Sequence, residues 1–511
     1  MAGGKLSRRD LLRLAGISGA TLLLKSCLPQ FPGKSLEGST AVPGLDSPDL
    51  EISLTAIPDQ VQLFPGKKTI VWRYRGEVVA GPNGALIESD NSYLGPTINV
   101  NRGDTVRVNF TNELPEPSII HWHGLHVPPA ADGHPRLVIE QGESYTYDFV
   151  VADRAGMYWY HPHPHGRTGP QVYAGLAGLF IIHDSSEKDL NLPSGVNDIP
   201  LVIQDRDFNS DNQLVYGTGN MMDNMVGFLG SLIVVNGQPD FQLSVTRQPH
   251  RLRILNGSNS RIYKLAWDDG RPIKIMATDG GLVEKAEQKD FVVLAPAQRI
   301  EIWADFSQDD PGSTRKLINL PFDSYGGQTS FPVVHIDIGD GPSIPGEMPE
   351  KISDLKPHAV ENAVNRLTPR TFKLAMAPGM VWTLNGRTFE MEEVTREEIV
   401  RLNDLEVWEF ENRSGSGMGM MGSMSLPHPM HIHGLQFQII ERIISSEDAQ
   451  RWSSLREGII DQGWHDTVLV FPGERVKILI KFEDFTGLYL YHCHNLEHED
   501  MGMMRNYQVK A

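Results

Sequence analysis

Four His-x-His pairs constrain this 511-residue chain more strongly than any other feature. Side chains alternate across a β-strand, so the two histidines of such a pair point to one side and the residue between them to the other. Eight of the 18 histidines fall in these pairs. Because eight gathered imidazoles suit copper, zinc or iron better than magnesium or calcium, the pattern predicts a transition-metal site. The pairs are His121/His123, His161/His163, His431/His433 and His492/His494.

The pairs recur within an internal repeat. Residues 156–163 and 487–494 both read G-x-Y-x-Y-H-x-H. Upstream, the strand-like run at 104–112 is similar to the run at 404–412, and each precedes another pair. Because the same order of motifs occurs in two distant parts of the chain, we expect two related domains that both supply metal ligands.

A third copy of the upstream run stands at 251–258, without a His-x-His pair behind it. Short alternating apolar runs broken by Gly, Pro, Asn and Asp predict strands and tight turns, and no βαβ pattern stands out. We therefore expect an all-β chain of three sandwich domains, the middle one without metal ligands. Their predicted bounds are about 50–190, 195–345 and 365–511.

Cys493 indicates which metal is bound. It stands between the two histidines of the fourth pair, so its sulfur should face away from the cluster that those histidines serve. On that side His428, His498 and Met503 can complete a second site. One thiolate, two imidazoles and a thioether are the ligand set of a blue copper electron-transfer centre.

Residues 1–49 predict export. Arg8 and Arg9 resemble the pair of a twin-arginine signal, and an apolar stretch follows as far as Leu24. Cys27, the only cysteine besides Cys493, is a candidate for lipidation, for removal or for a spacer residue, and a linker rich in Pro, Gly and Ser follows. We expect a periplasmic, envelope or extracellular protein. Its net charge of −18 disfavours nucleic-acid binding.

Together these motifs resemble the three-domain multicopper oxidases of the bacterial laccase and copper-efflux oxidase kind. The resemblance covers about residues 50 to 511 and rests on HWHG at 121–124, HPH at 161–163, HPMHIHG at 428–434 and HCHNLEHEDMGM at 492–503. It implies three consecutive cupredoxin-like Greek-key β-sandwich domains. It also implies an oxidoreductase that oxidises a reducing substrate in one-electron steps and reduces O2 to water.

The same resemblance implies four copper ions: one type 1, one type 2 and two type 3. The type 1 ligands would be His428, Cys493, His498 and Met503. The type 2 ligands would be His121 and His431, and the type 3 ligands His123, His161, His163, His433, His492 and His494.

Water formation consumes protons, and two carboxylates match the acidic positions that the family uses to supply them. Asp132 lies nine residues after His123, and Glu499 lies beside His498. We expect both to act as catalytic proton relays, because buried carboxylates next to a metal can exchange protons. Asp466 matches a further acidic position near the ligands.

The motifs do not distinguish between two classes of reducing substrate, which are phenols or aryl amines on one side and Cu(I) on the other. Methionines stand at 418–424, just before His428, and at 221–225. Their thioethers could act as soft ligands for Cu(I), or their side chains could form an adaptable apolar lining over the type 1 site. Met424 and Leu426 depart from the Asp and Met that copper-efflux oxidases place there. The alternatives are a copper-free structural protein of the periplasm and a copper nitrite reductase-like electron-transfer enzyme. We expect a monomer.

Overall fold

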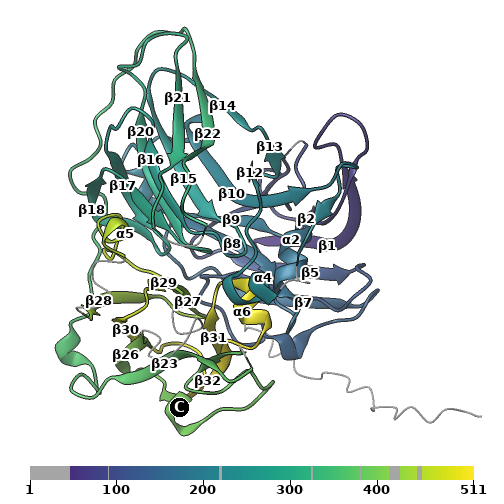
Figure 1. Ribbon diagram of the computed structural model, residues 1–511, viewed down its shortest axis with the longest axis vertical. Coiled ribbons are helices and arrows are strands. Elements are labelled where there is room, and N and C mark those ends of the chain that lie inside the picture. The colour runs from purple at the N-terminus through teal and green to yellow at the C-terminus, as the bar shows by residue number, and fades with distance from the viewer. Residues whose placement is uncertain are drawn as a thin grey trace, which may run out of the picture. The chain divides into compact units, whose positions relative to one another are not determined.

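The computed structural model describes residues 47–89, 91–217, 221–323, 326–379, 381–413, 426–445 and 452–511 (Figure 1). The N-terminal arginine pair and Cys27 lie outside these residues, as does the methionine-rich run at 418–424. The side chains of Met221 and Met222 lie outside them too. In the described part of the chain, no helix is both long enough and apolar enough to cross a membrane.

The first sandwich encloses one apolar core between two sheets. Its strands alternate between buried and half-buried residues, as in β5(Thr105–Asn112), because side chains of a strand point to opposite faces in turn. One sheet has the order β2(Thr69–Ala80), β1(Leu50–Val61), β5(Thr105–Asn112), β7(Ser144–Val150). The other has the order β3(Leu86–Ile87), β4(Thr97–Asn101), β9(Gly178–His183), β8(Gly156–Pro162), β6(Ile120–His123).

The middle sandwich is built in the same way around a second core. Its larger sheet has the order β13(Gln238–Pro239), β12(Leu232–Val235), β10(Asp198–Phe208), β15(Pro249–Asn256), β20(Arg299–Asp305), β17(Ile273–Thr278), β18(Gly281–Lys289), with β11(Leu214–Val215) paired to β10. The second sheet has the order β14(Gln242–Val245), β22(Phe331–Ile338), β21(Thr314–Asn319), β16(Tyr263–Trp267), β19(Val292–Leu294).

The third sandwich has two five-stranded sheets around a third core, which includes Cys493 and Met503. The first sheet has the order β24(Val381–Leu384), β23(Arg370–Ala377), β26(Leu405–Asn412), β30(Glu474–Lys481), β28(Phe437–Ile444). The second has the order β25(Ile399–Arg401), β32(Met504–Lys510), β31(Gly487–Cys493), β27(His428–Ile432), β29(Thr467–Val470).

One strand arrangement occurs in all three sandwiches. In each sandwich, one strand pairs antiparallel with its neighbour on one side and parallel with its neighbour on the other. The parallel pairs are β1 with β5, β10 with β15 and β23 with β26. Residues 251–256 of the third run thus lie in β15, at the position that β5 and β26 hold in their sheets. The all-β class is confirmed, whereas the domain bounds and the common origin of the three units stay predictions.

Helices are few and short in the described residues. Two of them, α4(Met221–Val226) and α6(Leu496–Asp500), lie against each other at the junction of the middle and third sandwiches (Figure 1). The α-helices are α2(Thr168–Ala174), α3(Ser185–Lys188), α4(Met221–Val226), α5(Ser453–Arg456) and α6(Leu496–Asp500), and the 3₁₀ helices are η1(Pro135–Leu137), η2(Gly195–Asn197), η3(Val360–Asn362) and η4(Arg396–Glu398).

Strand pairing brings the His-x-His pairs together. In the first sandwich β6 pairs antiparallel with β8, so that His121 lies opposite His161. In the third, β27 pairs with β31 and His431 lies opposite His492. The intervening Trp122 packs inside the core of the first sandwich. The alternation expected from the sequence therefore holds, and the histidines are left facing out of that core.

Candidate metal centre

The four pairs form one buried cluster between the first and third sandwiches. Rings from the two sandwiches stack on each other, His121 on His433 and His123 on His431, with centroids 3.6 and 3.7 Å apart. All eight side chains are buried. A cluster of imidazoles this dense and buried is unstable unless something satisfies its ring nitrogens.

Two ring nitrogens at its centre face each other with no proton between them. His121 Nδ1 lies 2.7 Å from the backbone oxygen of Asp132, and His431 Nδ1 lies 2.8 Å from that of Asp466. A carbonyl oxygen only accepts hydrogen bonds, so both Nδ1 atoms carry the proton and both Nε2 atoms present lone pairs. Those Nε2 atoms are 3.3 Å apart. A cation bound by both of them removes the conflict.

A second conflict of this kind involves His433 and His492. His433 donates from Nδ1 to the Asp132 carboxylate at 2.9 Å, and His492 donates from Nδ1 to the backbone oxygen of Cys493 at 3.1 Å. Their Nε2 lone pairs are then 3.0 Å apart. His163 Nε2 lies 3.3 Å from His492 Nε2 as well. These three histidines thus present ring nitrogens to one point.

A third group forms around His161. Its Nδ1 donates to the backbone oxygen of Pro162 at 2.9 Å, while His123 donates from Nε2 to the Asp466 carboxylate at 2.9 Å. His161 Nε2 and His123 Nδ1 are left 3.4 Å apart with facing lone pairs. His494 packs against both rings, and neither of its buried nitrogens has a hydrogen-bond partner among the described residues.

Burial keeps these rings neutral and available as ligands. Loss of hydration lowers the pKa of nine of the ten histidines in the motifs, and neighbouring imidazoles lower most of them further. The pKa falls to about 4 for His161 and to about 3 for His498. The nine are His121, His123, His161, His163, His428, His431, His433, His494 and His498.

We expect the metal-free protein to lose stability as the pH falls from about 6.5 towards 4. The pKa of each of these histidines is lower in the folded than in the unfolded chain, so the unfolded chain binds more protons in this window. Because one pKa unit corresponds to about 1.4 kcal/mol, several such groups should lower the free energy of unfolding by several kcal/mol. Urea midpoints at pH 7 and pH 5 measure this, and equal midpoints would contradict it.

A second cluster lies on the other side of β31. Cys493 Sγ is 3.4 Å from His428 Nδ1 and 3.7 Å from His498 Nδ1, and the two nitrogens are 3.3 Å apart. Met503 is buried in the same core, and its backbone oxygen accepts a hydrogen bond from the Cys493 amide at 3.0 Å. Burial raises the pKa of the Cys493 thiol, so a thiolate here requires a bound cation.

The middle sandwich closes this second cluster. The backbone oxygen of Met225 in α4 accepts hydrogen bonds from His498 Nε2 at 2.9 Å and from Trp382 Nε1 at 3.2 Å. The Trp382 ring packs on His428 and His498, with centroids 4.7 and 4.6 Å away. Because His498 donates from Nε2, its Nδ1 lone pair points to the sulfur.

Asp132 and Glu499 flank the eight-histidine cluster. The Asp132 carboxylate is buried, which raises its pKa, and its Oδ1 has no hydrogen-bond partner in the described chain. Glu499, on α6, places Oε2 3.1 Å from His492 Nδ1 and Oε1 3.5 Å from His163 Nε2. Neither contact is aligned as a hydrogen bond. Both carboxyl groups thus lie beside histidines of the cluster, where a proton relay would need them.

Asp466 contacts the cluster twice, through its carboxylate at His123 and through its backbone oxygen at His431. Its carboxylate is in turn held by Arg299 of the middle sandwich. Sequence reasoning noted Asp466 but missed Arg299 and Trp382. No local motif marks either residue, because their partners are 167 and more than 40 positions away.

His126 and His165 are near the cluster without joining it. His126 donates from Nδ1 to the backbone oxygen of Gly434, and its Nε2 lies 2.9 Å from Asp484. His165 packs against Phe389 at 4.9 Å. Among the described residues, these contacts tie both rings to groups outside the cluster.

Comparison with known proteins agrees with the resemblance that the sequence motifs indicate. Residues 75–187 and 362–511 each match a family model described as multicopper oxidase. A multicopper oxidase (mco) of Staphylococcus haemolyticus is 34% identical over 422 residues, which cover 82% of this chain and 83% of the relative. The crystal structure of McoA multicopper oxidase of Aquifex aeolicus matches with a TM-score of 0.77 and 36% identity, over 91% of this chain and 97% of that one.

The chain belongs to the multicopper oxidase family. It is an oxidoreductase with copper as cofactor, and it couples oxidation of a reducing substrate to reduction of O2. Its three sandwiches have the cupredoxin fold, as expected.

A relative with another name is also similar over nearly the whole chain. The cell division protein FtsP of Sodalis glossinidius is 30% identical over 521 residues, covering 99% of this chain and 98% of the relative. Overall similarity alone therefore does not distinguish oxidases from relatives named for other roles. Here every histidine and the cysteine of the motifs are present and buried, which does not favour the copper-free alternative.

Proposed function

We propose that the two clusters bind four copper ions in the type 1, type 2 and type 3 arrangement. Type 1 is held by Cys493 with His428, His498 and Met503. Type 2 and the two type 3 ions occupy the eight-histidine cluster. In this cluster, His121 and His431 hold the type 2 ion. One type 3 ion is held by His163, His433 and His492. The other type 3 ion is held by His123, His161 and His494.

The facing lone pairs carry this assignment. Three pairs of ring nitrogens in the eight-histidine cluster face each other with lone pairs 3.0 to 3.4 Å apart in a buried site. In each of these contacts within the eight-histidine cluster, both rings donate a hydrogen bond from their other nitrogen to a backbone or carboxylate oxygen. The nitrogen that faces the neighbouring ring therefore carries no proton. In the second cluster, the Nδ1 atoms of His428 and His498 are 3.3 Å apart. Soft, nitrogen-rich sites without carboxylate ligands suit copper.

Copper bound at these sites would supply one-electron oxidation of the substrate at type 1 and four-electron reduction of O2 to water at the trinuclear cluster. The chain supplies the path between them, because Cys493 is joined by single peptide links to His492 and His494. The chain also supplies protons, for which Asp132 and Glu499 are the proposed donors, each lying beside a histidine of the cluster.

The reducing substrate is a small molecule, either a phenol or aryl amine or Cu(I). Trp382 covers one face of the type 1 histidines with an aromatic ring, whereas the methionines at 418–424 that would favour Cu(I) lie outside the described residues. Export by the twin-arginine route, with Cys27 as a candidate lipid anchor, completes the proposal.

The copper-loaded protein should be blue, contain four copper ions per chain and consume O2 without releasing hydrogen peroxide. Copper content, visible absorption and oxygen uptake with a phenol and with Cu(I), measured side by side, test this. A colourless protein, or turnover of nitrite without oxygen uptake, would overturn it. The ratio of the Cu(I) rate to the phenol rate identifies the preferred substrate class.

A further inference from the structure

Arg299 is a buried cation of the middle sandwich, the one unit to which no copper ligand is assigned. It begins β20 and is 1% exposed. A guanidinium has five N–H donors, and all five are used here. Nη1 and Nη2 donate to the two oxygens of Asp466 at 2.8 and 2.6 Å. Nε, Nη1 and Nη2 also donate to the backbone oxygens of Met157, Ala297 and Asp279.

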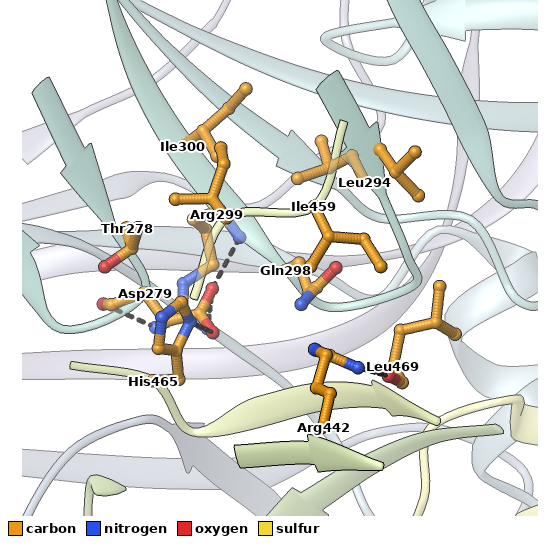
Figure 2. Close-up of a pocket in the computed structure, with 12 residues that line it drawn as sticks. Thr278, Asp279, Leu294, Gln298, Arg299, Ile300, Arg442, Ile459, His465 and Leu469 are labelled. Atoms are coloured by element: carbon orange, nitrogen blue, oxygen red, sulfur yellow. Dashed lines mark hydrogen bonds and ion pairs between the residues drawn. The ribbon is translucent and has the colours of Figure 1, made fainter. Parts of the chain in front are cut away.

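These acceptors belong to all three sandwiches. Met157 is in β8, the strand that carries His161 of the cluster. Ala297 and Asp279 are in the middle unit, and Asp466 precedes β29. Figure 2 shows Asp279 between the side chains of Arg299 and His465, at a small pocket between the middle and third sandwiches. The Asp279 carboxylate accepts from the Arg299 backbone amide at 2.7 Å. Arg299 is thus fixed at both its backbone and its side chain.

Asp466 links Arg299 to two histidines of the cluster through hydrogen bonds. Its carboxylate accepts from His123 Nε2, which leaves Nδ1 as the only nitrogen of that ring able to bind a metal. Its backbone oxygen accepts from His431 Nδ1, which leaves Nε2 free in that ring. Carboxylates that orient metal-binding histidines in this way set both tautomer and ring direction. A bidentate arginine allows the carboxylate one orientation.

The glycine after His123 shows how tightly these groups pack. Gly124 has φ +89°, and a Cβ there would lie 2.5 Å from Asp466 Oδ2 and 2.8 Å from Arg299 Nη2. Only a residue without a side chain lets the backbone beside a ligand approach the ion pair. The last residue of the HWHG motif therefore has a partner in the middle sandwich.

We infer that Arg299 is a positioning residue of the trinuclear site, through which the middle sandwich sets the orientation of His123 and His431 by way of Asp466. The inference rests on the proposed copper sites. It gives the unit without assigned ligands a direct part in building the centre that the other two units share.

The test compares Arg299→Gln with Arg253→Gln in the copper-loaded full chain. Arg253 is a matched control, because it is also a buried arginine of the same sheet that carboxylates hold, here those of Glu301, Asp198 and Glu187. Arg299→Gln should keep the blue type 1 absorption and lose copper from the trinuclear site, with a changed type 2 EPR spectrum. Oxygen uptake should fall about 10- to 100-fold. Arg253→Gln should keep four copper ions and the native spectrum.

Two further variants keep the test decisive if Arg299→Gln folds poorly. Arg299→Lys retains the charge with fewer donors and should retain more copper than the glutamine variant. The Arg299→Gln/Asp466→Asn double variant should lose no more copper than Asp466→Asn alone, because the arginine acts through that carboxylate. Additive losses, or a native EPR spectrum in Arg299→Gln with only a lower unfolding midpoint, would overturn the inference. A wild-type protein without four copper ions would instead refute the proposed function on which it rests.

Discussion

Replacing Cys493 with serine is expected to abolish the blue colour and substrate oxidation while the protein stays folded. The thiolate is the soft ligand that defines a blue copper site, and a neutral hydroxyl is a poor substitute for it. The same residue links the type 1 cluster to His492 and His494, so electrons also lose their shortest path. The loss of activity should exceed the roughly 10- to 100-fold that follows from removing a residue that only supports a ligand.

The measurements are visible absorption, copper content and oxygen uptake with a phenol. Copper content should fall from four to about three ions per chain, because the eight-histidine cluster is untouched. Met430→Leu is the matched control, since Met430 lies opposite Cys493 in the strand register, is equally buried and is assigned no copper. Leucine conserves its volume. A Cys493→Ser protein that still oxidises the phenol would refute the type 1 assignment.

The sequence was enough to predict the fold class and the two faces of the ligand strands. An alternation of period two is a local property, so His492 and His494 could be placed on one side of β31 and Cys493 on the other. The structure agrees, with Cys493 in the core of the third sandwich and the histidines against the first. Two copies of each motif added the inference that distant strands share one centre.

What the sequence could not supply are the contacts between sandwiches. The proton on each imidazole is set by acceptors such as the backbone oxygens of Asp466 and Met225, and any residue has such an oxygen. Arg299 reaches Asp466 across 167 positions, and β20 has no recognisable motif. Such pairings depend on how the three units dock, which no local period encodes.

Replacing Glu499 with glutamine is expected to leave copper binding near native and to slow oxygen reduction by about 10²-fold, the lower end of what general acid–base groups contribute. Glutamine keeps the size and polarity of the side chain but cannot take up and release a proton at neutral pH. The carboxylate lies beside His163 and His492, and neither of its oxygens has a hydrogen-bond partner among the described residues.

Separate half-reactions locate the defect. When substrate is added without oxygen, the blue colour of the variant should bleach as fast as in the wild type, because the Glu499 carboxylate lies against His163 and His492 of the eight-histidine cluster. When oxygen is then admitted, the colour should return more slowly, and the difference should widen at high pH, where protons from solvent are scarce.

Glu497→Gln is the control for this comparison. Glu497 is an equally buried carboxylate of the same helix, but Tyr216 and Asn259 donate hydrogen bonds to it at 2.6 and 3.0 Å on the side of the middle sandwich. Its variant should reoxidise at the wild-type rate. If both variants are equally slow, a change in the packing of α6 explains the result better than a lost proton. If Glu499→Gln strips copper or slows the anaerobic bleaching, the carboxylate supports a ligand, and the relay role passes to Asp132, the other unsatisfied acid beside the histidines.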